Sequence, residues 1–140
     1  MTAIDTNVFI ALWDKDDVFN LAAQQALDEA LDAGLMLIAA LVYAELLAGP
    51  SRNEKMLDEF FAQAEIQVDW DIPERVWRMA GAASQALSVR RRVSKGNGPR
   101  RIIADFVIGA HALANDCSLL TLDQEFFRRN FPGLTVKSFL

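Results

Sequence analysis

Short apolar runs and amphipathic stretches alternate along the chain. The apolar runs have the length and composition of strands, and five of them stand out: 1–5, 35–39, 66–70, 118–122 and 135–139. Between these runs the hydrophobic residues recur three or four positions apart, as they do on one face of a helix. Strands that alternate with helices predict an α/β fold with a central parallel sheet covered on both faces.

Turn residues give the expected boundaries of the helices. Gly34 should end the first long helix, Ser51 can cap a helix that follows it, and Pro73 should open another long one. That helix is expected to break in a mobile loop at 95–99. Helices are thus predicted at 7–14, 17–33, around residue 45, from 51 to 61, from 73 onward, at 104–114 and at 123–130.

The composition is that of a globular domain in water. Hydrophobic residues make up 52% and charged residues 24% of the 140 residues, and no apolar run reaches the roughly 18 residues that a membrane-spanning helix needs. A chain of this length can bury one core, so we expect a single domain over residues 1–140 without membrane contact. The N-terminus lacks the features of a secretory signal, and the single Cys117 cannot form an internal disulfide, so we expect a cytoplasmic protein.

Positive charge is concentrated in a basic strip between residues 90 and 101. The chain has a formal net charge of −5, yet six of its 14 Lys and Arg residues lie in this strip without an acid. They are Arg90, Arg91, Arg92, Lys95, Arg100 and Arg101. The strip could be a solvated helix end, because cations are favourable near a helix C-terminus. Its position directly before an acid in an apolar segment favours a role in neutralising phosphates.

Four acidic residues stand in apolar surroundings. Asp5 and Asp123 each follow a predicted strand, whereas Glu45 and Asp105 each interrupt a predicted helix. Moving an ionised carboxylate out of water costs several kcal/mol of free energy unless a partner offsets that cost. Open parallel sheets place their ligands at the edge formed by the carboxyl ends of the strands, so Asp5 and Asp123 can converge there.

A divalent cation is the simplest species that would keep such a group of acids ionised together. Oxygen ligands favour hard ions, so magnesium or manganese is expected, and a chain without a Cys or His cluster argues against zinc. A simpler interpretation remains open for each acid. Asp5 and Asp123 could cap the helices that follow them, and Glu45 or Asp105 could lie on a partly exposed helix face.

The segments around the four acids resemble the motifs of the PIN-domain family, and specifically those of the VapC-type toxins of bacterial and archaeal toxin–antitoxin pairs. The matching segments are AIDTNVFIAL at Asp5, LVYAELLAG at Glu45, IADFVIGAHAL at Asp105 and LLTLDQEFF at Asp123. These segments lie near both ends and in the middle of the chain, in the same order as the motifs of the family. As a set they identify the family more specifically than any one of them does alone. The stretch before Asp105 is more arginine-rich than is typical, which bears on the choice of substrate.

The resemblance implies a PIN-like three-layer α/β/α fold and an endoribonuclease that uses Mg²⁺ or Mn²⁺ and is held inactive by a cognate antitoxin protein. Family members are commonly dimers, so a homodimer is implied as well. The four acids would be the catalytic and metal-binding residues, with Thr6, Asn7 and Thr121 as hydrogen-bonding groups around them. The basic strip would then bind RNA phosphates, although an antitoxin segment could use the same arginines.

The expected reaction is hydrolysis of a phosphodiester by a metal-activated water. One or two ions held by Asp5, Asp105 and Asp123 would lower the pKa of that water and orient it in line, and Glu45 would bind or orient a metal water. Since the metal makes the nucleophile, no Ser-His or Cys-His pair is required.

Two further residues on the helix of Asp105 are expected to be structural. His111 lies six residues beyond the acid and points to nearly the opposite helix face, so it is left out of the site. Gly109, four residues beyond the acid, should let this helix pack closely against a strand.

Three other functions compete with nuclease activity. A catalytically inactive PIN-like module would keep the fold and bind RNA or protein without cleavage. A phosphoryl-transfer enzyme could use Asp5 as a nucleophile, but Asn7 stands where a haloacid-dehalogenase-like phosphatase would have a second Asp. A flavodoxin-like nucleotide binder is disfavoured because no glycine-rich loop follows the first strand.

Overall fold

The computed structural model describes residues 1–94 and 103–137 of the chain. Its strands are β1 Thr2–Ile4, β2 Met36–Ala39, β3 Ile66–Asp69, β4 Ser118–Leu120 and β5 Val136–Lys137. Its helices are α1 Thr6–Trp13, α2 Asn20–Ala33, α3 Ala40–Leu47, α4 Glu54–Gln63, α5 Glu74–Ser94, α6 Ile103–Ala114 and α7 Gln124–Asn130. The alternation of strands and helices that the sequence predicts is confirmed, and residues 95–99, expected to form a loop, lie outside the described residues.

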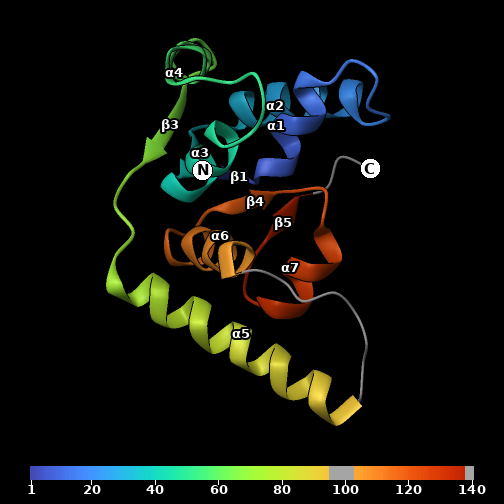
Figure 1. The fold of residues 1–140 in the computed structure, drawn as a ribbon, viewed down its shortest axis with the longest axis vertical. Coiled ribbons are helices and arrows are strands. Elements are labelled where there is room, and N and C mark those ends of the chain that lie inside the picture. The colour runs from blue at the N-terminus through green and yellow to red at the C-terminus, as the bar shows by residue number, and fades with distance from the viewer. Residues whose placement is uncertain (95–102, 138–140) are drawn as a thin grey trace.

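The strands form one parallel sheet in the order β3-β2-β1-β4-β5. In Figure 1, α1 to α3 lie on one side of β1 and β4 while α6 and α7 lie on the other, and α5 runs outside α6. The predicted three-layer α/β/α fold is therefore confirmed. Ile4 and Leu120 are register partners, so β1 and β4 end side by side and the residues that follow them share one edge of the sheet.

The core includes the central strands, aliphatic side chains of the helices and two groups of aromatic rings. All residues of β1 and β2 are buried, as expected for strands covered on both faces. Phe9 packs edge-on against Phe60 and Phe61 on one side of the sheet, and Phe106 packs in the same way against Phe126 on the other. Such edge-to-face pairs add packing energy beyond the burial of their area.

Two local expectations from the sequence are wrong in detail. Ser51 does not cap the helix that follows, because its φ of 64° is left-handed whereas a capping residue has extended backbone. Asn53 caps α4 instead, and its side chain accepts a hydrogen bond from Met56 N. Gly109 is buried against the ring of Phe131 rather than against a strand, and an added Cβ would overlap that ring.

None of the helices in the described part of the chain is both long enough and apolar enough to cross a lipid bilayer.

Candidate carboxylate site

Asp5 is a buried carboxylate at the carboxyl end of the central strand β1. Only 4% of its surface is exposed. Its Oδ1 accepts a hydrogen bond from Thr6 N at 2.7 Å, and its Oδ2 accepts one from Thr121 Oγ1 at 2.7 Å. Asp5 therefore caps α1, as its simpler interpretation predicts. The cap leaves the second carboxylate oxygen directed toward β4, where a further part of the site begins.

Thr121 connects the ends of β1 and β4. Its buried hydroxyl donates to Asp5 and accepts hydrogen bonds from Asp123 N at 3.0 Å and from Asn7 Nδ2 at 3.4 Å. A hydroxyl has one proton and two lone pairs, so these three bonds use its full capacity. Asn7 in turn accepts from Leu122 N at 3.1 Å. The network fixes the direction in which Thr121 donates, namely toward Asp5.

Glu45 reaches the same end of the sheet from α3. Its side chain is partly buried, and its Oε1 accepts a hydrogen bond from Thr6 Oγ1 at 2.7 Å. Thr6 therefore contacts two acids at once, since its N–H donates to Asp5 and its hydroxyl to Glu45. The three hydrogen-bonding residues proposed from the sequence, Thr6, Asn7 and Thr121, all lie in this network.

Asp105 adds a third negative charge from the first turn of α6. The pKa of Asp5 is raised from 3.8 to about 6, chiefly by burial and in addition by the negative charges of Asp105 and Glu45. The hydrogen bonds from Thr121 and Thr6 oppose this shift because they stabilise the ionised form. Three of the four predicted acids are thus electrostatically coupled at one edge of the sheet.

Asp123 stands at the start of α7, at the end of β4. It occupies the capping position, but its side chain makes no capping hydrogen bond, so the simpler interpretation of this acid as a helix cap is wrong. Its backbone N–H donates to the Thr121 hydroxyl, which links it to Asp5 through one residue. Its side chain lines an open cavity between α5 and α7 and a second one beside α7.

The chemistry of these donors suits a hard divalent cation, because each acid offers carboxylate oxygens alone. In the part of the chain that the structure describes, no three acidic, histidine or cysteine side chains are already gathered as a set of metal ligands. Magnesium commonly binds through one or two carboxylates and fills its remaining positions with water and substrate oxygens. The residues therefore fit such an ion without forming a closed protein cage.

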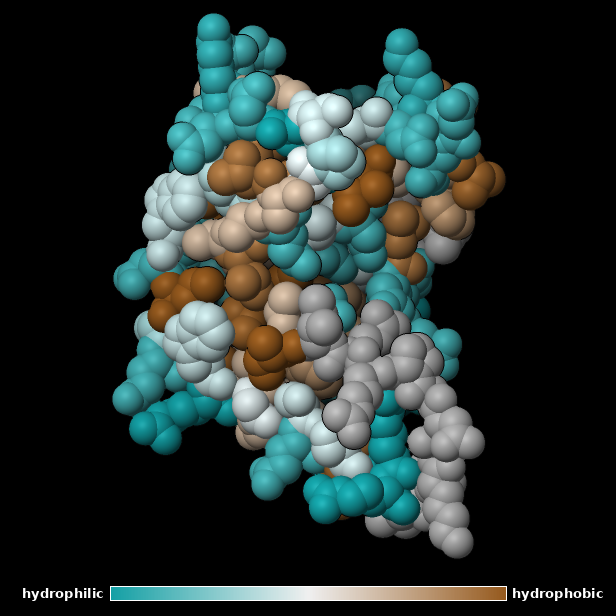
Figure 2. All heavy atoms as spheres, in the orientation of Figure 1, coloured by the Kyte–Doolittle hydropathy of each residue, from teal (hydrophilic) through white to brown (hydrophobic). Residues whose placement is uncertain are grey.

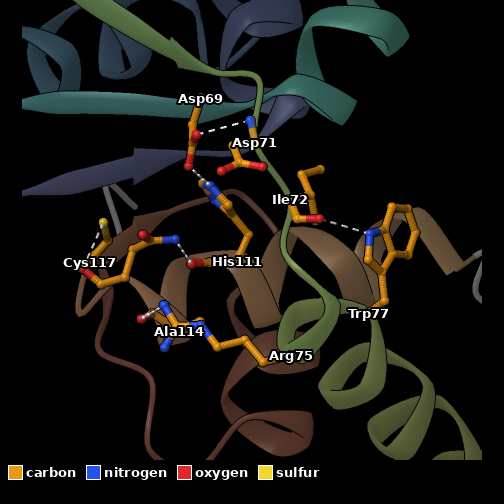
Figure 3. A network of polar contacts seen from close by, with 9 residues as sticks. Asp69, Asp71, Ile72, Arg75, Trp77, His111, Ala114 and Cys117 are labelled. Atoms are coloured by element: carbon orange, nitrogen blue, oxygen red, sulfur yellow. Dashed lines mark hydrogen bonds and ion pairs between the residues drawn. The ribbon is translucent and has the colours of Figure 1, made fainter.

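His111 lies apart from this group, as the sequence predicts. Figure 3 shows its ring directed toward the end of β3, where Nε2 is 2.8 Å from Asp69 Oδ2. The side chain of His111 is 1% exposed and that of Asp69 is 26% exposed. This histidine connects the middle of α6 to β3, which is a structural role.

The described part of the basic strip lies at the C-terminal end of α5. Arg90, Arg91 and Arg92 occupy this end, and Arg90 Nη2 donates to Asn130 Oδ1 of α7 at 2.6 Å. Lys95, Arg100 and Arg101 lie outside the described residues. Strongly hydrophilic atoms gather in Figure 2 at the lower end of the molecule, where α5 ends in Figure 1.

Sequence reasoning missed a second group of cations in α7. Arg128 and Arg129 are exposed, and Arg129 lines the same cavity as Arg91 and Asp123. In the sequence they are the basic end of a short helix, which has an ordinary explanation in the helix dipole. The packing of α5 beside α7 is what places Arg91 next to them.

A parallel α/β sheet with a buried aspartate at the carboxyl end of its central strand, flanked by further acids, has its candidate site at the edge where open α/β sheets bind ligands. The chain belongs to the PIN domain family, whose model matches residues 2–132. The resemblance seen in the four sequence segments is therefore confirmed at the level of the family.

Solved structures with the same fold come from toxin–antitoxin complexes. The chain resembles one in VapBC2 from Rickettsia felis bound to a promoter DNA fragment, with a TM-score of 0.71 and 21% identity over 98% of this chain and 97% of the other. It also resembles one in VapBC-1 from nontypeable Haemophilus influenzae, with a TM-score of 0.71 and 19% identity over 99% and 97%. It also resembles a chain in a toxin–antitoxin complex from Klebsiella pneumoniae, with a TM-score of 0.65 and 18% identity over 97% of each chain.

No curated protein sequence matches the chain. At identities of 18 to 21%, the likeness to these structures shows a shared fold and no more. Any activity of the chain has to follow from the residues of its own site.

Proposed function

We propose that this protein is a metal-dependent endoribonuclease that hydrolyses RNA phosphodiester bonds. The observation that carries the proposal is the buried carboxylate of Asp5, which two further acids crowd at the carboxyl edge of the sheet. A fold that only needed a helix cap would gain nothing from placing Glu45 and Asp105 close enough to disfavour its ionised form. Membership of the PIN domain family supports the same conclusion.

The roles follow from the position of each residue. Asp5, Asp105 and Asp123 would hold one or two Mg²⁺ or Mn²⁺ ions, and Glu45 would complete the set or orient a bound water. When bound, such an ion lowers the pKa of water and stabilises charge on phosphate oxygens. Thr121 and Thr6 hold the Asp5 and Glu45 carboxylates in fixed directions through their hydrogen bonds. A fixed carboxylate is needed because the attacking oxygen must approach in line with the leaving group.

The proposed biological role is that of a toxin in a type II toxin–antitoxin pair. The solved structures that share the fold are of VapBC and other toxin–antitoxin complexes, and they support an antitoxin protein as partner. We further propose a homodimer acting in the cytoplasm, which is where cellular RNA would be reached. The described cations of α5 are the proposed contacts to RNA, with an antitoxin segment as their other candidate.

Cleavage of a mixed cellular RNA pool tests the nuclease proposal. Purified protein free of antitoxin is incubated with Mg²⁺ or Mn²⁺, with EDTA, and as the Asp5→Asn variant. A matched control is Asp28→Asn, which removes a carboxylate from the exposed face of α2. We expect metal-dependent cleavage by the wild type and Asp28→Asn, and none by Asp5→Asn or with EDTA.

Binding of RNA by a folded, metal-loaded wild type that cuts no RNA in the pool would contradict the proposal. It would replace the enzyme by a PIN-like module that binds RNA without cleavage.

A further inference from the structure

An open cavity of about 260 Å³ lies between the C-terminal half of α5 and α7. Its lining includes Arg91 from α5 and Asp123, Arg129 and Asn130 from the start and end of α7. A neighbouring cavity of about 700 Å³ shares Asp123 and Arg129 and adds Arg128. Both cavities therefore extend from one of the proposed site acids to a group of guanidinium groups.

We propose that Arg91, Arg128 and Arg129 form a subsite for the phosphates of the RNA backbone next to the bond that is cleaved. The inference rests on the proposed nuclease function, and it assigns a role to α7 arginines that neither the family resemblance nor the basic strip includes. Asp123 lines both cavities while belonging to the carboxylate site. A strand with one phosphate at that site and its backbone along these cavities would place a neighbouring phosphate over the arginines.

The geometry of α7 fits this arrangement. Arg129 stands six residues after Asp123, about 9 Å further along the helix axis, and both residues line the same cavity. The acid thus lies at the beginning of the helix, and the cations lie at its end.

Two contacts keep the cations ready for phosphate. Arg90 donates to Asn130 of α7 at 2.6 Å, which holds the end of α5, and with it Arg91, against the cavity. Arg129 pairs with Glu125 at 3.0 Å, but the two side chains are 65% and 83% exposed. An exposed pair of this kind contributes little stability, so the guanidinium can exchange Glu125 for a phosphate at small loss. Arginine suits the task because its planar fork binds two phosphate oxygens.

RNA is a better occupant than an acidic peptide for an electrostatic reason. Asp123 and Glu125 also line the cavity, and they would repel the carboxylates of a peptide. A phosphodiester strand is repelled as well, but a divalent ion held by Asp123 would offset that repulsion, because phosphate oxygens are ligands that such an ion accepts. The arginines would then contact the next phosphate along the strand.

Arg78 provides a matched control within the same molecule. It lies near the other end of α5 and pairs with Glu74 four residues earlier, at 3.4 Å, with side chains that are 76% and 81% exposed. The Arg129–Glu125 pair has the same spacing and similar exposure. Replacing either arginine by alanine removes one exposed cation and one weak ion pair, so a difference between the two variants reports position alone.

The test is the salt dependence of RNA binding, measured by fluorescence anisotropy of a labelled oligouridine with Mg²⁺ in the cleavage-deficient Asp5→Asn background. We expect Arg129→Ala to weaken binding roughly tenfold. We expect it also to reduce the slope of log K against log salt by about 0.7, the value for one lost contact to a single strand. Arg129→Lys should keep most of the slope, because the charge remains. Arg78→Ala should change neither quantity.

Three outcomes would overturn the subsite. An Arg129→Ala variant with the affinity and slope of Arg78→Ala, while the wild-type protein still cleaves RNA, would remove the subsite and leave the nuclease intact. A variant that loses binding of labelled poly-glutamate instead of RNA would assign the cavity to an acidic peptide. If the wild-type protein neither binds nor cleaves RNA, the nuclease proposal and the subsite both fail. Equal thermal unfolding midpoints for both alanine variants confirm that folding is not the cause.

Discussion

Two buried polar groups in this molecule differ in how their charge is compensated. His111 is buried in α6, and its Nε2 lies 2.8 Å from a carboxylate oxygen of Asp69, so the buried ring has a hydrogen-bond partner. Asp5 is buried at the end of β1 with two hydrogen-bond donors, but the nearby charges of Asp105 and Glu45 have its own sign. The first arrangement stabilises the fold, whereas the second disfavours the ionised form of Asp5.

Under the proposed function, this difference separates a residue that serves packing, His111, from one that serves the chemistry, Asp5. A buried polar group that serves only the fold is matched by a partner, because an unmatched one destabilises the protein. Like charges that lie close together repel one another unless a ligand of opposite charge binds between them. For carboxylates such a ligand is a cation. The contrast between Asp5 and His111 can be tested by replacing each residue.

The largest expected effect is on catalysis. Asp5→Asn should reduce metal-dependent RNA cleavage by at least about a hundredfold, because a neutral amide neither holds nor orients the cation as a carboxylate does. Asp69→Asn, which changes the partner of His111 in the same isosteric way, should leave the cleavage rate per folded molecule within about threefold of the wild type. Single-turnover rates under saturating Mg²⁺ measure both. A comparable loss in the two variants would erase the proposed distinction.

The next effect is on stability and concerns the histidine. His111→Ala should lower the free energy of unfolding by about 3 kcal/mol, because it leaves a cavity in the core and removes the partner of Asp69. Urea unfolding followed by circular dichroism gives this value. Arg78→Ala, an exposed change on α5, should stay within about 0.5 kcal/mol of the wild type. A His111→Ala variant as stable as that control would show that the pair contributes nothing.

A third effect links Asp5 to pH. Its pKa in the fold is raised from 3.8 to about 6, so the folded state binds the proton more tightly than the unfolded state does. The contribution of Asp5 to stability is therefore fully present below pH 3.8 and is lost as the pH rises through about 6, with a total change of about 3 kcal/mol.

Urea unfolding of metal-free protein tests this pH dependence. The free-energy difference between Asp5→Asn and the wild type should shift in favour of the variant by about 2 kcal/mol between pH 4 and pH 8, which is most of the total change. Added Mg²⁺ should reduce that shift, since the cation stabilises the ionised carboxylate. A constant difference across this pH range would mean that Asp5 ionises in the fold as it does in water.

The smallest expected effect concerns the hydrogen bond from Thr121 to Asp5. Thr121→Val keeps the shape of the side chain but removes the donor that stabilises the ionised carboxylate. The pKa of Asp5 in metal-free protein should therefore rise by about one further unit. Carboxyl ¹³C chemical shifts followed through a pH titration measure it. Asn7→Ala, which removes a weaker contact at 3.4 Å from the same hydroxyl, should move the pKa less.

The fold was largely predictable, and its misjudged details have local causes. The fully buried strands β1 and β2 follow from unbroken apolar composition, because a strand covered on both faces has no polar side. Ser51 and Asn53 are both good helix caps by residue type, and the choice between them depends on backbone angles that the loop imposes. Gly109 was correctly expected to allow close packing, but its neighbour Phe131 comes from beyond α7.

The candidate site was predictable as a set of residues and less so as an arrangement. Each of the four acids stands out in the sequence because an acid among apolar residues requires compensation. The structure couples Asp5 to Glu45 and Asp105, and it connects Asp123 to them through Thr121. Arg129 had no such signal, because a cation at the end of a surface helix has a sufficient local explanation.

The sequence by itself determined the strands, the helices and the unusual acids, because each depends on the character of neighbouring residues along the chain. The tertiary structure alone decided which side chains form hydrogen bonds with one another. Thr121 donates to Asp5 across 116 positions, and Thr6 donates to Glu45 across 39. Both contacts exist because the sheet order places β4 beside β1 and the helices return to the same edge. Such pairings depend on how whole elements pack, which a local pattern does not record.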